Sequence, residues 1–495
     1  HIAQDYIQRK SLNFTNVRIN QTSEKPQIYD LSNFSLSYSY NETFARDINT
    51  EYDILKNYRG GLNYIYNTRP KLISPFKKVK FLSSRYLALI KDFNFYYMPS
   101  SFSFRTDVFR RYQTNKTRNI YNPGNIIEPT FNKEFNWNRY YDLKWDLAQS
   151  LKFDFSATNI ARIDEPYGEQ NQEWKDSVWK SIKDFGRNVE YNHNFKVSYR
   201  VPINKIPLLD WTSANVTYNG TYNWESGPLL SPESTYDLGN TIRNSRTIQL
   251  NGQANLTNLY NKVGFLKRIN QKYSKPRAVR KSREKETVNY EDKSVVFRAN
   301  RTKSIYHNLN TEDISTVVVT DAKGNEIKGN WEVSTKKKIT FKPEVDADNA
   351  TIKVTGKVEK KDNPLIFIAE NTAMLLMSIK SANISYTQTE GSSLAGYKNS
   401  TNMLGMDQNF EAPGWPFIAG WQDDEFASDV ISNKWYTQDT SLNTPFMMTQ
   451  SRNLNIRVMM EPIRGLKIDL TANRTHAENN SQYYTFASTD PYNEI

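Results

Sequence analysis

Residues 151–158 read LKFDFSAT, and this stretch decides the fold because apolar and polar residues alternate strictly from Leu151 to Thr158. Side chains of a β-strand point alternately to opposite faces, so such a segment has one apolar and one polar face. The same alternation recurs at residues 102–108, 143–147, 216–224, 247–256 and 466–471. The chain is therefore predicted to be all-β.

The length of the alternating segments indicates what kind of sheet they form. Soluble strands usually have about five or six residues, whereas a tilted strand needs about 9 to 11 to cross the hydrocarbon of a bilayer. The expected strands are 11–20, 31–44, 51–67, 101–114, 135–148, 150–162, 189–201, 212–225, 245–257, 372–389, 451–461 and 465–475. Most of them are long enough to span. In 372–389 the apolar parity changes, which predicts a bulge at residues 380–381.

The connectors between these strands alternate in length. Three are short, at 149–150, 202–209 and 462–465. Four are long, at 115–134, 163–188, 226–244 and 390–450. Periplasmic turns and extracellular loops of outer-membrane barrels differ in this way. The connectors 68–100 and 258–371 fall on the short side although both are long.

Composition agrees with a barrel. The 495 residues include 31 Tyr, 25 Phe and 10 Trp, and such rings suit a membrane–water boundary. A mean hydropathy of −0.74 is expected when polar and apolar faces average out. The most apolar run, 364–377, is interrupted by Glu370 and Asn371, so no helix is expected to span a bilayer. The start at His1, without a signal peptide, suggests an internal fragment.

One stretch differs from the rest. Residues 275–361 are charged and have shorter strand patterns, at 315–320, 339–342 and 351–355, with a turn at Gly324-Asn325. We expect a small, soluble, β-sandwich-like periplasmic domain here, of immunoglobulin-like topology, tethered by 258–274 and 356–363. The expected organisation is therefore barrel strands with loops in 1–274, the insert in 275–361, and barrel strands with a long extracellular loop in 362–495.

Much of the +12 net charge lies beside this insert. Residues 262–303 contain 14 Lys and Arg against four acidic residues. A solvated linker explains this excess, and contact with anionic lipid, peptidoglycan or an acidic partner is the alternative. Aromatic residues do not interleave the basic ones as in nucleic-acid-binding segments, so no nucleic-acid partner is expected.

The sequence offers little catalytic chemistry. No cysteine is present, which excludes disulfides and thiolate metal sites, and the four histidines fit no metal or nucleophile motif. His193 is interpreted as a packing residue; a hydrolase pairing of His476 with Asp469 remains an alternative. The acidic clusters 423–425 and 346–348 match no calcium loop and are interpreted as solvated charge. We expect no enzyme, catalytic residue, metal or cofactor.

Two groups of residues are candidates for function. The loop 411–421, EAPGWPFIAGW, carries Trp415, Phe417 and Trp421, and aromatic residues at this density either fold back on the barrel or contact a partner. The second group would face an aqueous lumen and is of mixed charge: Lys144, Asp146, Lys152 and Asp154. The solvated face of any half-buried sheet would show the same residues.

Several longer strings resemble a known family. They are YDLKWDL at 141–147, KFDFSATN at 152–159, ARIDEP at 161–166, DFNFYYMPSSFSFR at 92–105, PLLDW at 207–211 and YNGTYNW at 218–224. Together they resemble the SprA/Sov family, the outer-membrane translocons of the type IX protein secretion system of Bacteroidota. The resemblance runs over most of the chain.

This resemblance implies a very large single-chain transmembrane antiparallel β-barrel, of which this chain is a part. It would export folded cargo proteins to the cell surface and be linked to gliding motility. Implied partners are secreted cargo, an outer-membrane shuttle barrel protein, a plug protein, periplasmic and surface accessory proteins, and membrane lipid with lipopolysaccharide. The chain would be integral to the bacterial outer membrane, with extracellular loops and periplasmic turns and insert. Alternatives are a ligand transporter or lipopolysaccharide-inserting barrel, a β-rich adhesin, and an outer-membrane enzyme.

Overall fold

The chain divides into two compact units in a computed structural model. The structure describes residues 4–20, 27–121, 124–229, 236–274, 285–359, 364–463 and 465–484. The first unit comprises His1–Leu256, Lys380–Met460 and Ile468–Ile495. The second comprises Thr257–Ile379 and Glu461–Lys467.

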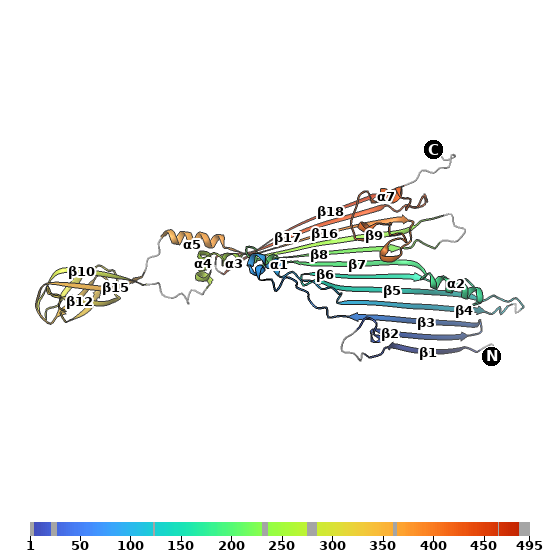
Figure 1. The fold of residues 1–495 in the computed structure, drawn as a ribbon, viewed down its shortest axis with the longest axis horizontal. Helices are drawn as coiled ribbons and strands as arrows, with labels where there is room; N and C mark the ends of the chain where they lie inside the picture. The colour runs from blue at the N-terminus through green and yellow to red at the C-terminus, as the bar shows by residue number, and fades with distance from the viewer. Residues whose placement is uncertain are drawn as a thin grey trace, which may run out of the picture. The chain divides into compact units, whose positions relative to one another are not determined.

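The first unit is built on one sheet of twelve strands, which lie side by side in chain order (Figure 1). They are β1 (Tyr6–Val17), β2 (Phe34–Arg46), β3 (Thr50–Asn67), β4 (Ser101–Thr117), β5 (Thr130–Ala148), β6 (Leu151–Arg162), β7 (Arg187–Val201), β8 (Thr212–Glu225), β9 (Asn240–Asn255), β16 (Ile379–Tyr397), β17 (Phe446–Ile463) and β18 (Leu466–Gln482). They are 12 to 19 residues long, so the predicted long-stranded antiparallel sheet is confirmed. β1 and β18 are its end strands, and among the residues that the structure describes these two strands are not paired with each other.

The strands are staggered steadily in one direction. One cross-strand row starts at Phe34 and Tyr64, runs through Ala157, and ends at Asn244 and Ser392. Phe34 is the first residue of β2, whereas Ser392 lies near the far end of β16. A stagger that accumulates along a sheet means that the strands tilt, as closing a barrel requires.

The connectors differ between the two ends of the sheet, except that residues 47–49 join β2 to β3 by a short turn at the end where the long connectors lie. Short turns join β5 to β6 and β17 to β18, and connectors 163–186 and 398–445 lie at the other end. The first of these long connectors contains α2 (Gln172–Lys183), and the second contains α6 (Trp415–Ile418) and α7 (Phe426–Ser432). Connector 68–100, at the short-turn end, contains α1 (Ala88–Lys91).

The second unit contains helices and a β-sandwich. Its helices are α3 (Leu256–Tyr260), α4 (Gly264–Ser274) and α5 (Pro364–Leu376). The helices pack through a small apolar cluster around Ile269, Ala373 and Met377. In the described part of the chain, no helix is both long and apolar enough to cross a membrane.

Two three-stranded sheets form the sandwich, in the orders β10-β15-β12 and β11-β14-β13. Their strands are β10 (Lys285–Phe297), β11 (Lys303–Tyr306), β12 (Ile314–Thr320), β13 (Gly329–Thr335), β14 (Lys338–Pro343) and β15 (Ala347–Glu359). Phe297, Ile339, Ile352 and Val354 form its buried core. The turn at Gly324-Asn325 is present, with Gly324 at φ +90°.

Three sequence predictions differ in detail from the structure. Residues 372–376 belong to helix α5 and not to a strand. The prediction failed because an apolar run without a clear period is compatible with either element. The pairing of β16 with β9 begins at Ser381, at the place of the predicted bulge, and is continuous from there to Ala395, so the register of this pair shifts only between Ala395 and Tyr397. Of the second expected tether, 356–363, residues 356–359 belong to strand β15 of the sandwich; the first, 258–274, contains the end of α3 and all of α4, and residues 275–284 and 360–363 lie outside the described part of the chain.

Candidate functional site

One face of the twelve-stranded sheet is polar and hollowed; we call it the polar face. A hollow on it is lined by Asn16 of β1, Asn63 of β3, Asp142 of β5 and Thr158 of β6. A second hollow continues from Ser156 of β6 across the neighbouring strands to Thr449 of β17. A hollow that spans many strands means that the sheet curves around this face.

The charged candidates lie on the polar face. Lys144 is opposite Asp154 and Asp146 is opposite Lys152 across the β5–β6 pair. The Lys152 Nζ lies 3.6 Å from the Asp146 Oδ1, and both side chains are exposed. Exposed pairs of this kind contribute little to stability, about 0–1 kcal/mol. The four side chains therefore face solvent on the polar face.

The opposite face is apolar, and much of it is uncovered; we call it the apolar face. Large side chains there keep 37% to 54% of their surface exposed: Leu12, Phe14, Leu36, Tyr38, Phe102, Tyr199, Leu250 and Ile384. Cross-strand pairing places all of them on this one face, and we call the surface that they form the apolar band. A contiguous exposed apolar surface spanning so many strands marks contact with a membrane or another protein.

Toward the long-connector end, the apolar face is covered by the connector 398–445, which we call the cover segment. Its Met406, Phe417, Phe426 and Val430 pack into one buried cluster with side chains of the sheet such as Tyr222. The rings of Phe417 and Phe426 stack with centroids 4.1 Å apart. The cover segment thus buries the apolar side chains at the long-connector end of this face, whereas the apolar band remains exposed.

Backbone contacts fix the cover segment to the sheet. The side-chain amide of Asn244 donates to the carbonyls of Phe417 and Trp421, at 2.9 and 2.8 Å. A ring nitrogen of the buried His193 lies 2.9 Å from the Ile418 carbonyl oxygen. The structure therefore gives His193 a packing and anchoring contact.

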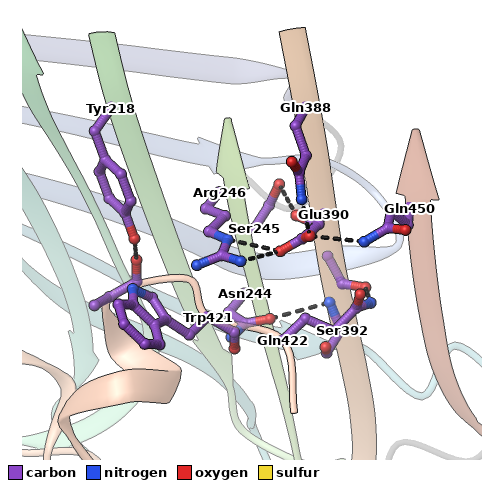
Figure 2. A network of polar contacts seen from close by, with 12 residues as sticks. Tyr218, Asn244, Ser245, Arg246, Gln388, Glu390, Ser392, Trp421, Gln422 and Gln450 are labelled. Carbon is purple, nitrogen blue, oxygen red and sulfur yellow. Dashed lines mark hydrogen bonds and ion pairs between the residues drawn. The ribbon is translucent and has the colours of Figure 1, made fainter. Parts of the chain in front are cut away.

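A buried ion pair lies beside this contact (Figure 2). Arg246 of β9 and Glu390 of β16 approach to 2.6 Å, with side chains only 18% and 4% exposed. Glu390 also accepts hydrogen bonds from the amides of Gln388 and Gln450. The guanidinium carbon of Arg246 lies 5.3 Å from the centre of the Trp421 ring. The carboxylate is thus shared by β9, β16 and β17.

Further ion pairs occupy the same face between the apolar band and the long connectors. Arg110 of β4 pairs with Glu165 of connector 163–186, at 2.6 Å and with both side chains largely buried. Lys10 of β1 pairs with Glu42 of β2 at 3.0 Å. Paired charges therefore begin on this face where the exposed apolar side chains end.

The three aromatic candidates of the cover segment differ in how far they are buried. Phe417 is buried in the cluster, whereas Trp415 and Trp421 are 53% and 54% exposed. Trp415 stacks on Phe410, and Trp421 lies over Arg246. The structure brings Phe417 and Trp421 to the sheet and leaves the two tryptophans accessible.

The Arg246–Glu390 pair was not among the sequence candidates. A signal existed, since Arg246 has the same parity as Ile248, Leu250 and Gly252 and so puts a charge on the apolar face. The alternative pairing of His476 is not supported by geometry. Asp469 bonds to Arg457, and it is an odd number of residues from His476, which places the two on opposite faces.

Comparisons with known proteins add little. No family model and no curated protein matches the chain. Among solved structures, the siderophore receptor PirA from Pseudomonas aeruginosa is similar at a TM-score of 0.17 and 11% identity, covering 96% of this chain and 73% of that one. A TM-score this low carries no argument about fold or function.

Proposed function

We propose that this chain forms part of the wall of a large β-barrel in the bacterial outer membrane, with the polar face toward an aqueous lumen and the apolar face toward lipid. One observation carries the proposal: the hollowed side of the sheet is polar, and its back is an exposed apolar band. A soluble sheet would bury that band in a core.

Strand geometry supports the same assignment. The strands are long enough to cross the hydrocarbon, and their stagger matches the tilt that barrels need. The open edges at β1 and β18 expose backbone groups that lipid cannot satisfy. Further strands beside these edges would complete a wall, and about 16 to 18 strands already leave an aqueous channel.

Within that class, we propose a protein-conducting channel that exports folded cargo to the cell surface, as in type IX secretion linked to gliding motility. The support is the resemblance of strings such as residues 92–105 and 141–166, together with a wide polar surface. The partners proposed with it are the cargo, a shuttle barrel, a plug protein, periplasmic and surface accessory proteins, and outer-membrane lipid. No catalysis and no cofactor are part of this proposal.

Consecutive residues on opposite faces give a direct test of the membrane assignment. Leu250 lies on the apolar face and Asn251 on the polar face. Spin labels at L250C and N251C would be placed in the full-length protein in lipid nanodiscs, with any cysteine outside this chain removed. The label at 250 should respond to oxygen dissolved in lipid, and the label at 251 to a water-soluble nickel complex. Equal exposure of both labels to water would sink the barrel-wall assignment.

Depletion of the full-length protein tests the transport assignment. Surface proteins exported in folded form should accumulate in the periplasm while other outer-membrane proteins assemble normally. If export continues and uptake of a small ligand or lipopolysaccharide insertion fails instead, the barrel has one of those functions.

A further inference from the structure

Three neighbouring strands present a surface without charge on the polar face; we call it the neutral strip. At every second position from Ser213 to Thr221 in β8, Ser245 to Gln253 in β9 and Asn383 to Gly391 in β16, the residue is Asn, Gln, Ser, Thr or Gly; the next position of β9 on this face, Arg243, ends the strip. The registers of β9 with β8 and with β16 place these positions side by side on the same face.

The rest of the polar face is different. In β4 it presents Arg105, Asp107 and Arg111, and in β5 it presents Asp142 and Lys144. Strand length and burial are similar in both parts, so the absence of charge from the neutral strip does not follow from the fold. The same side of the sheet accepts charge elsewhere.

Side chains of the neutral strip bond to one another across strands. The Ser385 hydroxyl donates to the Asn251 amide oxygen at 2.8 Å, and the hydroxyls of Thr247 and Thr389 lie 3.2 Å apart. None of the positions on this strip is buried, so water reaches all of them. Part of the hydrogen-bonding capacity is used within the wall, and water takes the remainder.

Such a surface gives a passing protein little to bind. Folded proteins adhere to one another mainly by burying apolar surface and by matching charge. The neutral strip has neither large apolar groups nor charge, and exchanging water for a neutral hydrogen bond gains only about 0.5–1.5 kcal/mol. It also carries no aromatic ring on which a sugar could stack, which argues against a polysaccharide as its occupant.

We propose that the neutral strip is a low-adhesion track that lets folded cargo of either net charge pass along the wall. The track would make export insensitive to the isoelectric point of the cargo. This inference rests on the proposed function, because it takes folded protein as the material that moves through the lumen.

A row of three matched positions tests the track. Gln249 of β9 is paired with Thr217 of β8 on one side and with Thr387 of β16 on the other. The full-length protein would carry T217K/Q249K/T387K, the mirror variant T217E/Q249E/T387E, or the neutral control T217N/Q249N/T387N. Each strain exports two folded reporters with the same export signal, one strongly acidic and one strongly basic.

The lysine row should slow the acidic reporter and the glutamate row the basic one, each roughly tenfold, as three exposed ion pairs of about 0.5 kcal/mol would give. The neutral control should export both at the wild-type rate. The inference is overturned if both charged rows leave both reporters unchanged, or slow both equally. Because a triple variant could fail to assemble, the single substitutions T217K and Q249K repeat the comparison at smaller effect.

A binding measurement separates this inference from the proposed function. Purified full-length protein would be mixed with the same reporters, lacking their export signals, at low ionic strength. Retention of the acidic reporter by the lysine row and of the basic one by the glutamate row, beyond wild type, supports the neutral strip even if export in cells proves independent of this protein. Equal retention by wild type and both rows overturns it.

Discussion

Glu390 holds the Arg246 guanidinium against which Trp421 of the cover segment packs. Replacing Glu390 with alanine leaves the Arg246 guanidinium in a buried site without its carboxylate, which costs about 3–5 kcal/mol. Glu390→Ala should therefore release the cover segment, whose Lys398 and Lys434 are exposed trypsin sites. Limited proteolysis of the full-length protein would measure the release as faster cleavage at these two lysines.

Asp469→Ala is the matched control for that substitution. The Arg457–Asp469 pair joins neighbouring strands of the same sheet, but its side chains are 55% and 47% exposed. Removing an exposed pair costs at most about 1 kcal/mol, so cleavage of the cover segment should stay at the wild-type rate. Equal cleavage in the two variants would mean that the buried pair does not hold the segment.

At the scale of elements, Gly420 sets how closely the cover segment approaches β9. Gly420 has φ +87°, and a Cβ there would lie 2.4 Å from the Ser245 carbonyl oxygen. Gly414 also has a positive φ, of +98°, but a Cβ there would meet nothing closer than 3.8 Å. Gly414 has ψ 146° and so lies in a backbone region that glycine almost alone adopts, and Gly414→Ala should cost about 1–3 kcal/mol. Gly420→Ala adds the clash with Ser245 and should cost clearly more. Thermal melting of the buried cluster, followed by tryptophan fluorescence, would rank the two.

The sandwich of residues 285–359 should fold when produced alone, because its core of Phe297, Ile339 and Phe341 is its own. Phe341→Ala should cost about 3–5 kcal/mol and leave this small domain largely unfolded in circular dichroism. Val318→Ala, at a half-exposed position on β12, should melt close to wild type. A wild-type fragment without a cooperative transition would contradict the prediction.

Acid should lower the stability of the sandwich by protonating Asp321 in the turn of residues 321–325. The backbone amides of Asn325 and Lys323 donate to the Asp321 carboxylate and hold its pKa below the ordinary value of 3.8. A lowered folded-state pKa stabilises above the unfolded value, and that contribution is lost as the pH falls through the lowered pKa. Asp321→Asn should therefore reduce the change in melting temperature between about pH 5 and pH 2, which calorimetry can measure.

The strands of the sheet could be predicted because each satisfies its own pattern: in β6 and β8 the alternation alone defines both faces. Helix α5 could not, since its apolar run has no strand or helix period, and packing on Ile269 decides its form. The Arg246–Glu390 pair depends on a register between residues 144 apart and on a cover segment without regular pattern. Neither this register nor the path of the cover segment can be predicted from the local sequence.

For the whole molecule, the two edge strands provide the sharpest test. Every residue of β1 and nearly every residue of β18 is exposed, and each strand has a neighbour on one side only. In hydrocarbon an unsatisfied backbone group costs several kcal/mol, so a membrane wall cannot leave such edges open.

In the full-length protein in nanodiscs, amide hydrogens of residues 6–17 and 466–482 should therefore exchange as slowly as those of β5, which is paired on both sides. Hydrogen exchange read by mass spectrometry would show this. Fast exchange along both edges, beside a slow β5, would mean that no further strands pair there and that the sheet does not form a barrel wall in lipid.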